Sequence, residues 1–152
     1  MSQINVDTIA TAAGVEHARL VQVVNTTNVA MTTGTTAIPH DDTIPQNDEG
    51  DQILSRTITP THASNKLLIE VIVQWATASN VMMCCALFED SDASAICASG
   101  HYGSNREQNS MRLQHFMTTG GTSEITFKVR FGATSGTTTI NGDNGARTYG
   151  GV

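Results

Sequence analysis

The strongest strand signal in the chain lies at residues 66–76, which read KLLIEVIVQWA. In an extended chain the odd-numbered positions of this stretch share one face, which carries Ile69, Val71, Val73 and Trp75. The other face mixes polar residues with Leu68 and Ile72. Because both faces are partly apolar, the pattern predicts a strand in the middle of a sheet.

Shorter strand signals lie on both sides of this stretch. They are predicted at residues 20–24, 32–38, 52–59, 81–88, 93–99, 111–118, 124–131 and 137–140. The segment 124–131 is the most regular, and we expect it at the surface with its charged side chains outward and Phe127, Val129 and Phe131 inward. Turn residues separate the segments, including Gly120-Gly121 and the glycine-rich run at 141–145.

These segments predict an all-β fold, an antiparallel β-sandwich or jelly roll of about eight or nine short strands. Residues 17–152 are expected to form this single domain. Residues 1–16 are too short to fold alone and are interpreted as an N-terminal arm. Its large apolar residues include Ile4, Val6 and Ile9, and we expect the arm either to pack on a neighbour or to be disordered.

Composition excludes several classes of protein. Charged residues make up 14% of the chain, and threonine fills 22 positions, which favours strands and excludes a coiled coil or a helical bundle. The net charge is −6 with only eight basic residues, so no nucleic-acid-binding face is expected. No apolar run approaches the roughly 20 residues needed to span a bilayer.

An acidic loop is the first candidate for a metal site. His40-Asp41-Asp42 and Asp48-Glu49-Gly50-Asp51 could supply oxygen ligands to calcium, but their spacing differs from that of an EF-hand loop. A solvated loop between two strands is the favoured interpretation, and whether it binds a metal stays open. The sequence thus predicts no metal and no cofactor.

No catalytic motif is present either. His62, Ser64 and Asp51 include the residue types of a triad, but no glycine-flanked nucleophile accompanies them. Few aromatic residues are available to line a sugar-cleaving cleft. We therefore expect a protein that is not an enzyme.

Several loop segments resemble those of a family of bacteriophage and prophage virion structural proteins. The segments are TGTTAIP (33–39), DTIPQ (42–46), EGD (49–51), ITP (58–60), SNKLLI (64–69), FKVRFG (127–132), ING (140–142) and GARTYGG (145–151). The resemblance covers roughly residues 19–152 and implies a jelly-roll-like domain that assembles as a homotrimer on the phage particle. Members usually continue past Gly-Gly-Val into a further β-prone strand, whereas this sequence stops at Val152. Either that strand is supplied differently or the given sequence ends before it, and the covering of one sheet edge stays open.

Two roles on the virion fit this resemblance. The first is a capsid decoration or cement protein, bound to the major capsid protein or to other virion proteins. It is favoured because only the short arm precedes the domain. In this role Ile4, Val6 and Ile9 of the arm would dock on the capsid or cross to a neighbouring subunit. The alternative is a tail-fibre or receptor-binding module that recognises a host surface glycan. Exposed loops would then make the contacts, and the candidates are Asp41, Asp42, His101, Tyr102 and Arg106.

The trimer contact is expected on the second face of the 66–76 strand, through Leu68 and Ile72. Identical apolar faces that meet around a three-fold axis would be removed from water. In either role the protein would be assembled in the host cytoplasm and end in the virion, and its action would be binding rather than catalysis.

Overall fold

The computed structural model describes residues 20–90 and 92–149. These residues form ten strands and no helix, so the all-β prediction is confirmed. The strands are β1 (Thr32–Gly34), β2 (Asp51–Ile58), β3 (Lys66–Thr77), β4 (Val81–Glu89), β5 (Cys97–Gly103), β6 (Gln108–Thr118), β7 (Ile125–Ala133), β8 (Thr138–Ile140), β9 (Gly142–Asp143) and β10 (Ala146–Arg147). The predicted docking residues Ile4, Val6 and Ile9 lie outside the described residues.

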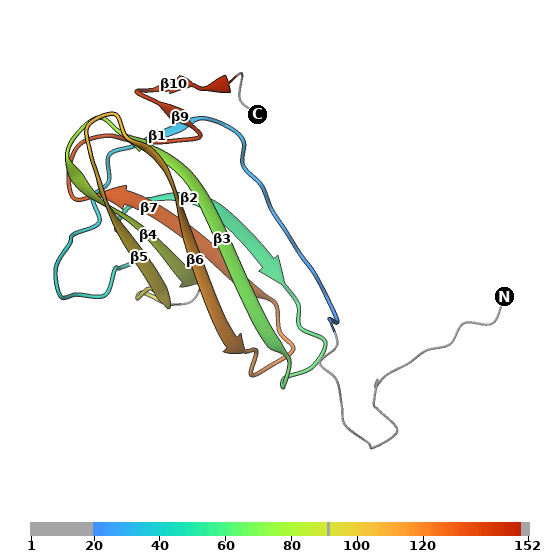
Figure 1. Ribbon diagram of the computed structural model, residues 1–152. Coiled ribbons are helices and arrows are strands. Elements are labelled where there is room, and N and C mark those ends of the chain that lie inside the picture. The colour runs from blue at the N-terminus through green and yellow to red at the C-terminus, as the bar shows by residue number, and fades with distance from the viewer. Residues whose placement is uncertain (1–19, 91, 150–152) are drawn as a thin grey trace, which may run out of the picture.

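Eight of the strands build two antiparallel four-stranded sheets that face each other (Figure 1). The β3 sheet has the order β1-β8-β3-β6, and the β7 sheet has the order β2-β7-β4-β5. Strands that follow each other along the chain mostly lie in opposite sheets. This is the strand order of a jelly roll, in which two Greek keys close over one core.

The core lies between the two sheets. β3 contributes Val71, Val73 and Trp75, all buried, as its alternation predicted. From the opposite sheet, Phe127, Val129 and Phe131 of β7 face them, which confirms the inward face predicted for 124–131. A second apolar contact lies outside the β7 sheet, where Ile38 is buried and its N–H donates to the carbonyl of Ala133.

β3 is central along only part of its length. Its pairing with β6 runs from Lys66 to Ala76, but β8 pairs with it only from Trp75 to Thr77. The first part of β3 therefore has a strand on one side only among the described residues.

The segment predicted at 124–131 is an interior strand whose charged side chains lie on the outer face of its sheet. β7 lies between β2 and β4 in the interior of its sheet. Its outward residues are half-buried rather than fully solvated: Lys128 pairs with Asp90, and the loop that follows Ile38 packs on Arg130. Arg130 donates from Nε to the carbonyl of Glu49 at 2.6 Å and from Nη2 to that of Gly50 at 2.7 Å.

Two predicted strand boundaries and one predicted strand also differ from the structure. β5 begins at Cys97 rather than at residue 93, because the segment before it pairs with another loop through a bridge between Gln46 and Ser94. β1 ends at Gly34, after which Thr36 bonds to Asp51 instead of continuing the sheet. Residues 20–24 form no strand and leave most of their apolar side chains exposed.

The glycine-rich run at 141–145 is more ordered than a simple turn. It contains β9, which pairs with β10 as a short ribbon. Asn144 and Gly145 connect the two strands, both with positive φ, which is the backbone of a two-residue hairpin turn. Asn141 anchors the ribbon, since its side-chain amide donates to the carbonyls of Asn28 and Ala30.

Candidate interaction surfaces

The predicted acidic loop holds its carboxylates in separate local contacts. Asp41 accepts bonds from the hydroxyl and N–H of Thr43, and these bonds lower the pKa of its carboxyl group. Asp51 accepts from Thr36, and Glu49 accepts from the N–H of Gln46. Within residues 20–90 and 92–149, no three histidine, cysteine or acidic side chains converge as metal ligands.

The three residues considered as a catalytic triad, His62, Ser64 and Asp51, do not form one hydrogen-bonded group. His62 Nδ1 lies 2.8 Å from the hydroxyl of Ser64 in the β2–β3 turn. The same ring nitrogen also accepts the N–H of Ser64, so this contact closes a local turn. Asp51 bonds to Thr36 instead, and within the described parts of the chain no carboxylate is bonded to His62.

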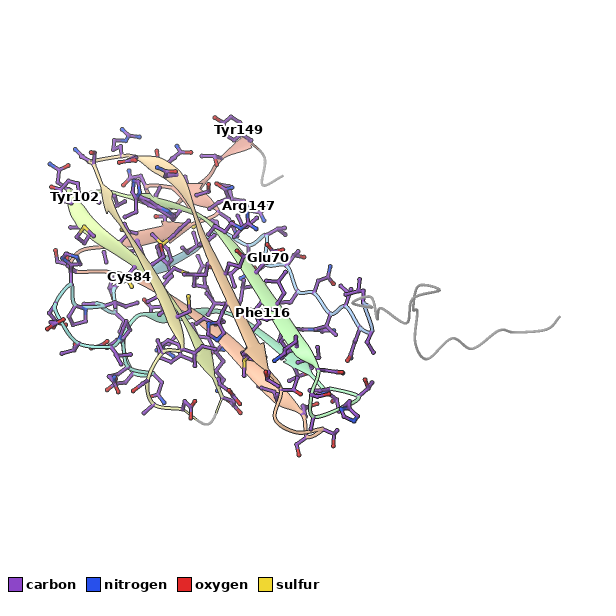
Figure 2. The ribbon with its side chains drawn as sticks, turned by 60° about the horizontal axis from the view of Figure 1, so that its bottom comes forward. Glu70, Cys84, Tyr102, Phe116, Arg147 and Tyr149 are labelled. Atoms are coloured by element: carbon purple, nitrogen blue, oxygen red, sulfur yellow. The ribbon has the colours of Figure 1, made fainter. Side chains whose placement is uncertain are left out.

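Two residues predicted in an exposed binding loop belong to a strand. His101 and Tyr102 are part of β5, which extends further along the chain than its sequence signal indicated. His101 points toward the core, with its ring centroid 5.4 Å from that of Trp75. Tyr102 points to solvent and remains available for contacts (Figure 2).

His101 is held by a polar group at the start of β6. Its Nε2 lies 3.3 Å from Glu107 Oε1 and 3.3 Å from Asn109 Nδ2. The N–H of Ser104 donates to Glu107 at 2.7 Å, and this bond, with those from Asn109 and His101, lowers the pKa of the Glu107 carboxyl. The arrangement joins β5, β6 and their loop and serves the fold.

The remaining predicted binding residues lie in different loops. Asp41 and Asp42 are exposed in the β1–β2 loop, whereas Arg106 lies in the β5–β6 loop and donates to Asp143 at 3.4 Å. In the part of the chain that the structure describes, no hydrogen bond or ion pair joins any of the five predicted residues to another.

The outer face of the β3 sheet carries large apolar side chains in solvent. Leu68 is 57% exposed and Ile72 is 65% exposed, both on β3. Phe116 on β6 is 64% exposed and lies opposite Leu68. Glu70 lies between the two β3 residues (Figure 2) and pairs with Arg112 of β6. We call Leu68, Ile72 and Phe116 the apolar strip.

Phe116 was missed from the sequence although a signal was present. The inward residues of its segment are Met111, Leu113, His115 and Met117. Phe116 is out of phase with them, so the same alternation that predicted the strand places its ring on the solvent face. With Leu68 opposite it, the ring adds to the exposed apolar side chains of this face.

A polar depression lies beyond the apolar strip, at the end of the sheet where β8 and the β9–β10 ribbon meet. Its volume is about 590 Å³, and its lining includes Gln74, Gln108, Ser110, Asn141, Thr148 and Tyr149. None of its described lining residues is charged. Tyr149 is 86% exposed at its margin, and the side chains of Gln74 and Gln108 make no bond with other described residues.

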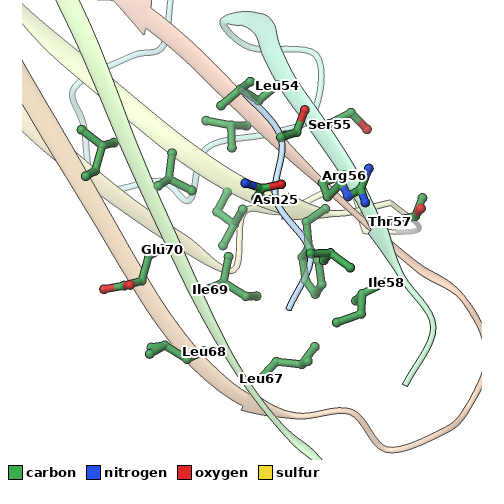
Figure 3. Close-up of a pocket in the computed structure, with 17 residues that line it drawn as sticks. Asn25, Leu54, Ser55, Arg56, Thr57, Ile58, Leu67, Leu68, Ile69 and Glu70 are labelled. Carbon is green, nitrogen blue, oxygen red and sulfur yellow. The ribbon is translucent and has the colours of Figure 1, made fainter. Parts of the chain in front are cut away.

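A second hollow is apolar and lies at the side of the sandwich, between β2, β3 and residues 24–26 (Figure 3). Its volume is about 240 Å³. The side chains that line it come from both sheets and include Leu54, Ile58, Leu67, Ile69, Phe127 and Val129. Such a lining suits apolar side chains rather than a polar ligand.

Comparison with known protein families and with curated proteins finds no match to this chain. None of the described residues forms a helix long and apolar enough to cross a membrane.

Proposed function

We propose that this chain is a non-enzymatic structural subunit of a bacteriophage particle, which associates as a homotrimer and decorates the capsid surface. The assignment to a phage particle and to three copies rests on the sequence segments that resemble phage virion proteins. Jelly rolls build many viral shells, which is a likeness of fold only. The observation that carries self-association is the apolar strip on the β3 sheet.

The apolar strip favours contact between copies. Three large apolar side chains stand in solvent on two neighbouring strands, and Leu68 and Phe116 form one cross-strand pair. Removing such side chains from water stabilises an interface by about 25 cal/mol per Å². In a trimer the strips of the three copies would gather around the three-fold axis, while each pairwise contact joins two different surfaces of the chain. Bonds between Glu70, Arg112 and Gln114 already satisfy the intervening charges.

Two measurements test this proposal. Light scattering of the protein as it elutes from a size-exclusion column should give the mass of three chains. A monomer at all concentrations would contradict self-association. Immunogold labelling of intact phage particles with an antibody to the domain should place gold over the head. Gold at the tail would select the second function below, and unlabelled particles would reject both.

The second function is a receptor-binding module at the phage tail that recognises a neutral host glycan. The polar depression favours it, because uncharged amide and hydroxyl groups beside an exposed tyrosine ring can bond to and stack on a sugar. The site differs from the loops expected from the sequence. Asp41, Asp42 and Arg106 are not among the residues that line the depression.

A glycan array of host surface polysaccharides tests the second function. Tyr149→Ala should abolish binding if the depression holds the sugar. Tyr102→Ala is the matched control, since Tyr102 is also exposed but lies on β5. Equal loss in both variants, or an array without any hit, would contradict this function.

A further inference from the structure

A charged pair lies in the middle of the apolar strip. Glu70 is on β3 between Leu68 and Ile72, and the three side chains share the outer face of the strand. Figure 3 shows Glu70 on the opposite side of β3 from Ile69, which lines the apolar hollow. Arg112 lies on β6 directly opposite Ile72 and donates from Nη2 to Glu70 Oε1. The pair is therefore part of the same surface as the strip.

A partner that covers the apolar strip also covers this pair. Side chains two positions apart on one face of a strand are separated by about 7 Å. A surface that contacts both Leu68 and Ile72 therefore spans Glu70. The side chain of Glu70 is 46% exposed and that of Arg112 is 60% exposed, so both lose water in such a contact. Desolvation of two charged groups is costly unless hydrogen bonds satisfy both of them.

One copy of the chain does not supply all of these hydrogen bonds. Glu70 Oε1 accepts from Arg112 and, at 3.3 Å, from Nε2 of Gln114. Among the residues that the structure describes, no bond reaches Glu70 Oε2 or the remaining N–H groups of the Arg112 guanidinium. Water can bind these groups in a monomer. In an assembly that buries the strip, another protein group must take its place.

The free groups of the pair complement those of a second copy. Arg112 presents N–H donors and Glu70 presents a carboxylate oxygen, and both stand on one surface. When copies gather around a three-fold axis with their strips together, the same two groups of the next copy come to this surface. A guanidinium has enough N–H groups to bond to two carboxylates at once. A purely apolar partner would instead leave the free groups of the pair buried without bonds.

We propose that in the assembled oligomer Arg112 of each copy donates to Glu70 Oε2 of a neighbouring copy, while its bond to Glu70 of its own chain remains. Three copies then close a ring in which the two charges alternate and sum to zero. This inference rests on the self-association proposed above and adds the contact that aligns the copies. A polar group within an apolar contact surface can fix register, because only one alignment satisfies its hydrogen bonds.

Single truncations test whether the pair lies in the contact. Glu70→Ala and Arg112→Ala each leave an unpaired charge there, so each should raise the dissociation constant roughly thirtyfold or more in sedimentation equilibrium. An exposed pair contributes little to the stability of one copy, so both variants should keep the circular dichroism spectrum of the unaltered chain. Lys128→Ala is the matched control, because Lys128 pairs with Asp90 on the β7 sheet. It should leave the dissociation constant unchanged.

A mixing experiment separates a bond between copies from the bond within one copy. Glu70→Arg places two positive charges on the strip face and Arg112→Glu places two negative charges there, so neither variant should associate alone. In an equal mixture the average mass should rise above that of either variant, because each supplies the charge that the other lacks. The pair within each chain stays broken in the mixture, so a bond made only within one chain predicts no recovery.

The contrary results are distinguishable from one another. An unaltered chain that stays monomeric at all concentrations would overturn the proposed self-association and this contact with it. A trimer whose dissociation constant is unchanged by Arg112→Ala would leave self-association standing and overturn the contact. Variants that weaken the trimer but do not recover on mixing would restrict the bond to single chains and overturn the ring.

Discussion

Leu68 on β3 lies directly opposite Phe116 on β6, and both side chains point to solvent. Apolar cross-strand pairs contribute about 0.2–1 kcal/mol within a sheet, far less than their full burial would. In a single copy both side chains therefore stay in water, and most of the stabilisation that their burial could give is not gained. Ile72, further along the same face, extends this surface.

Ile72→Asp and Leu68→Asp should each dissociate the oligomer. Burial of one such side chain stabilises by about 1.5–3 kcal/mol, so the dissociation constant should rise at least about tenfold. Light scattering measures the change. Ser110→Asp is the control, because Ser110 is exposed on the same face of β6 but lies outside the apolar strip. A variant Ile72→Asp that remains fully associated would place the contact elsewhere.

Arg130 should anchor the loop at residues 39–50 to the β7 sheet. Its two bonds to the carbonyls of Glu49 and Gly50 involve a half-buried charged donor, and bonds to charged groups contribute about 1.5–3 kcal/mol. Arg130→Ala should lower the free energy of unfolding by about that amount in urea titrations. Arg130→Lys should recover only part, since lysine lacks the planar fork. Arg56→Ala, on exposed β2 surface, should change stability by less than about 0.5 kcal/mol.

Gly34 and Asp51 should be energetically coupled. A Cβ atom at position 34 would collide with the Asp51 carboxylate, which accepts bonds from the N–H of Thr36 at 3.1 Å and from its hydroxyl at 2.8 Å. Gly34→Ala should therefore destabilise by about 1–3 kcal/mol. In an Asp51→Ala background the same change should cost at least about 1 kcal/mol less. Additive effects in the double-mutant cycle would contradict this contact.

Stability should fall in alkaline solution through the thiols of β4. Burial, with a smaller contribution from the charge of Glu49, raises the pKa of Cys84 to about 11, and burial also raises the pKa of Cys85. Thiols of the unfolded chain ionise near pH 8.5. Above that pH the unfolded chain binds fewer protons than the native chain, so the free energy of unfolding decreases as pH rises.

Urea midpoints between about pH 8 and pH 10 measure this effect. They should be constant below the pKa of an exposed thiol and decline above it. The double variant Cys84→Ala/Cys85→Ala should decline less steeply, although its midpoint at neutral pH is lower because of the lost packing. Parallel curves for both proteins would assign the alkaline loss to other groups.

Local alternation predicted most strands correctly. In segments 66–76 and 124–131 one face is buried in a core, so every second residue must be apolar wherever the strand is placed. The same logic located the turn at Gly120-Gly121, where Gly120 has a φ of 68°. It also placed Leu68 and Ile72 on the solvent face, as the structure has them.

The sequence alone therefore determined the fold class, the inward faces of the main strands and two residues of the apolar strip, because these depend on residues two positions apart. The tertiary structure decided the partners of each strand, such as the position of β7 between β2 and β4. It also decided that the segment before β5 forms a bridge with another loop, so that β5 begins only at Cys97. It also decided where pairing stops along β3 and which residues line the polar depression. These features depend on contacts between residues far apart in the chain. A local sequence pattern does not show which of these contacts is most stable.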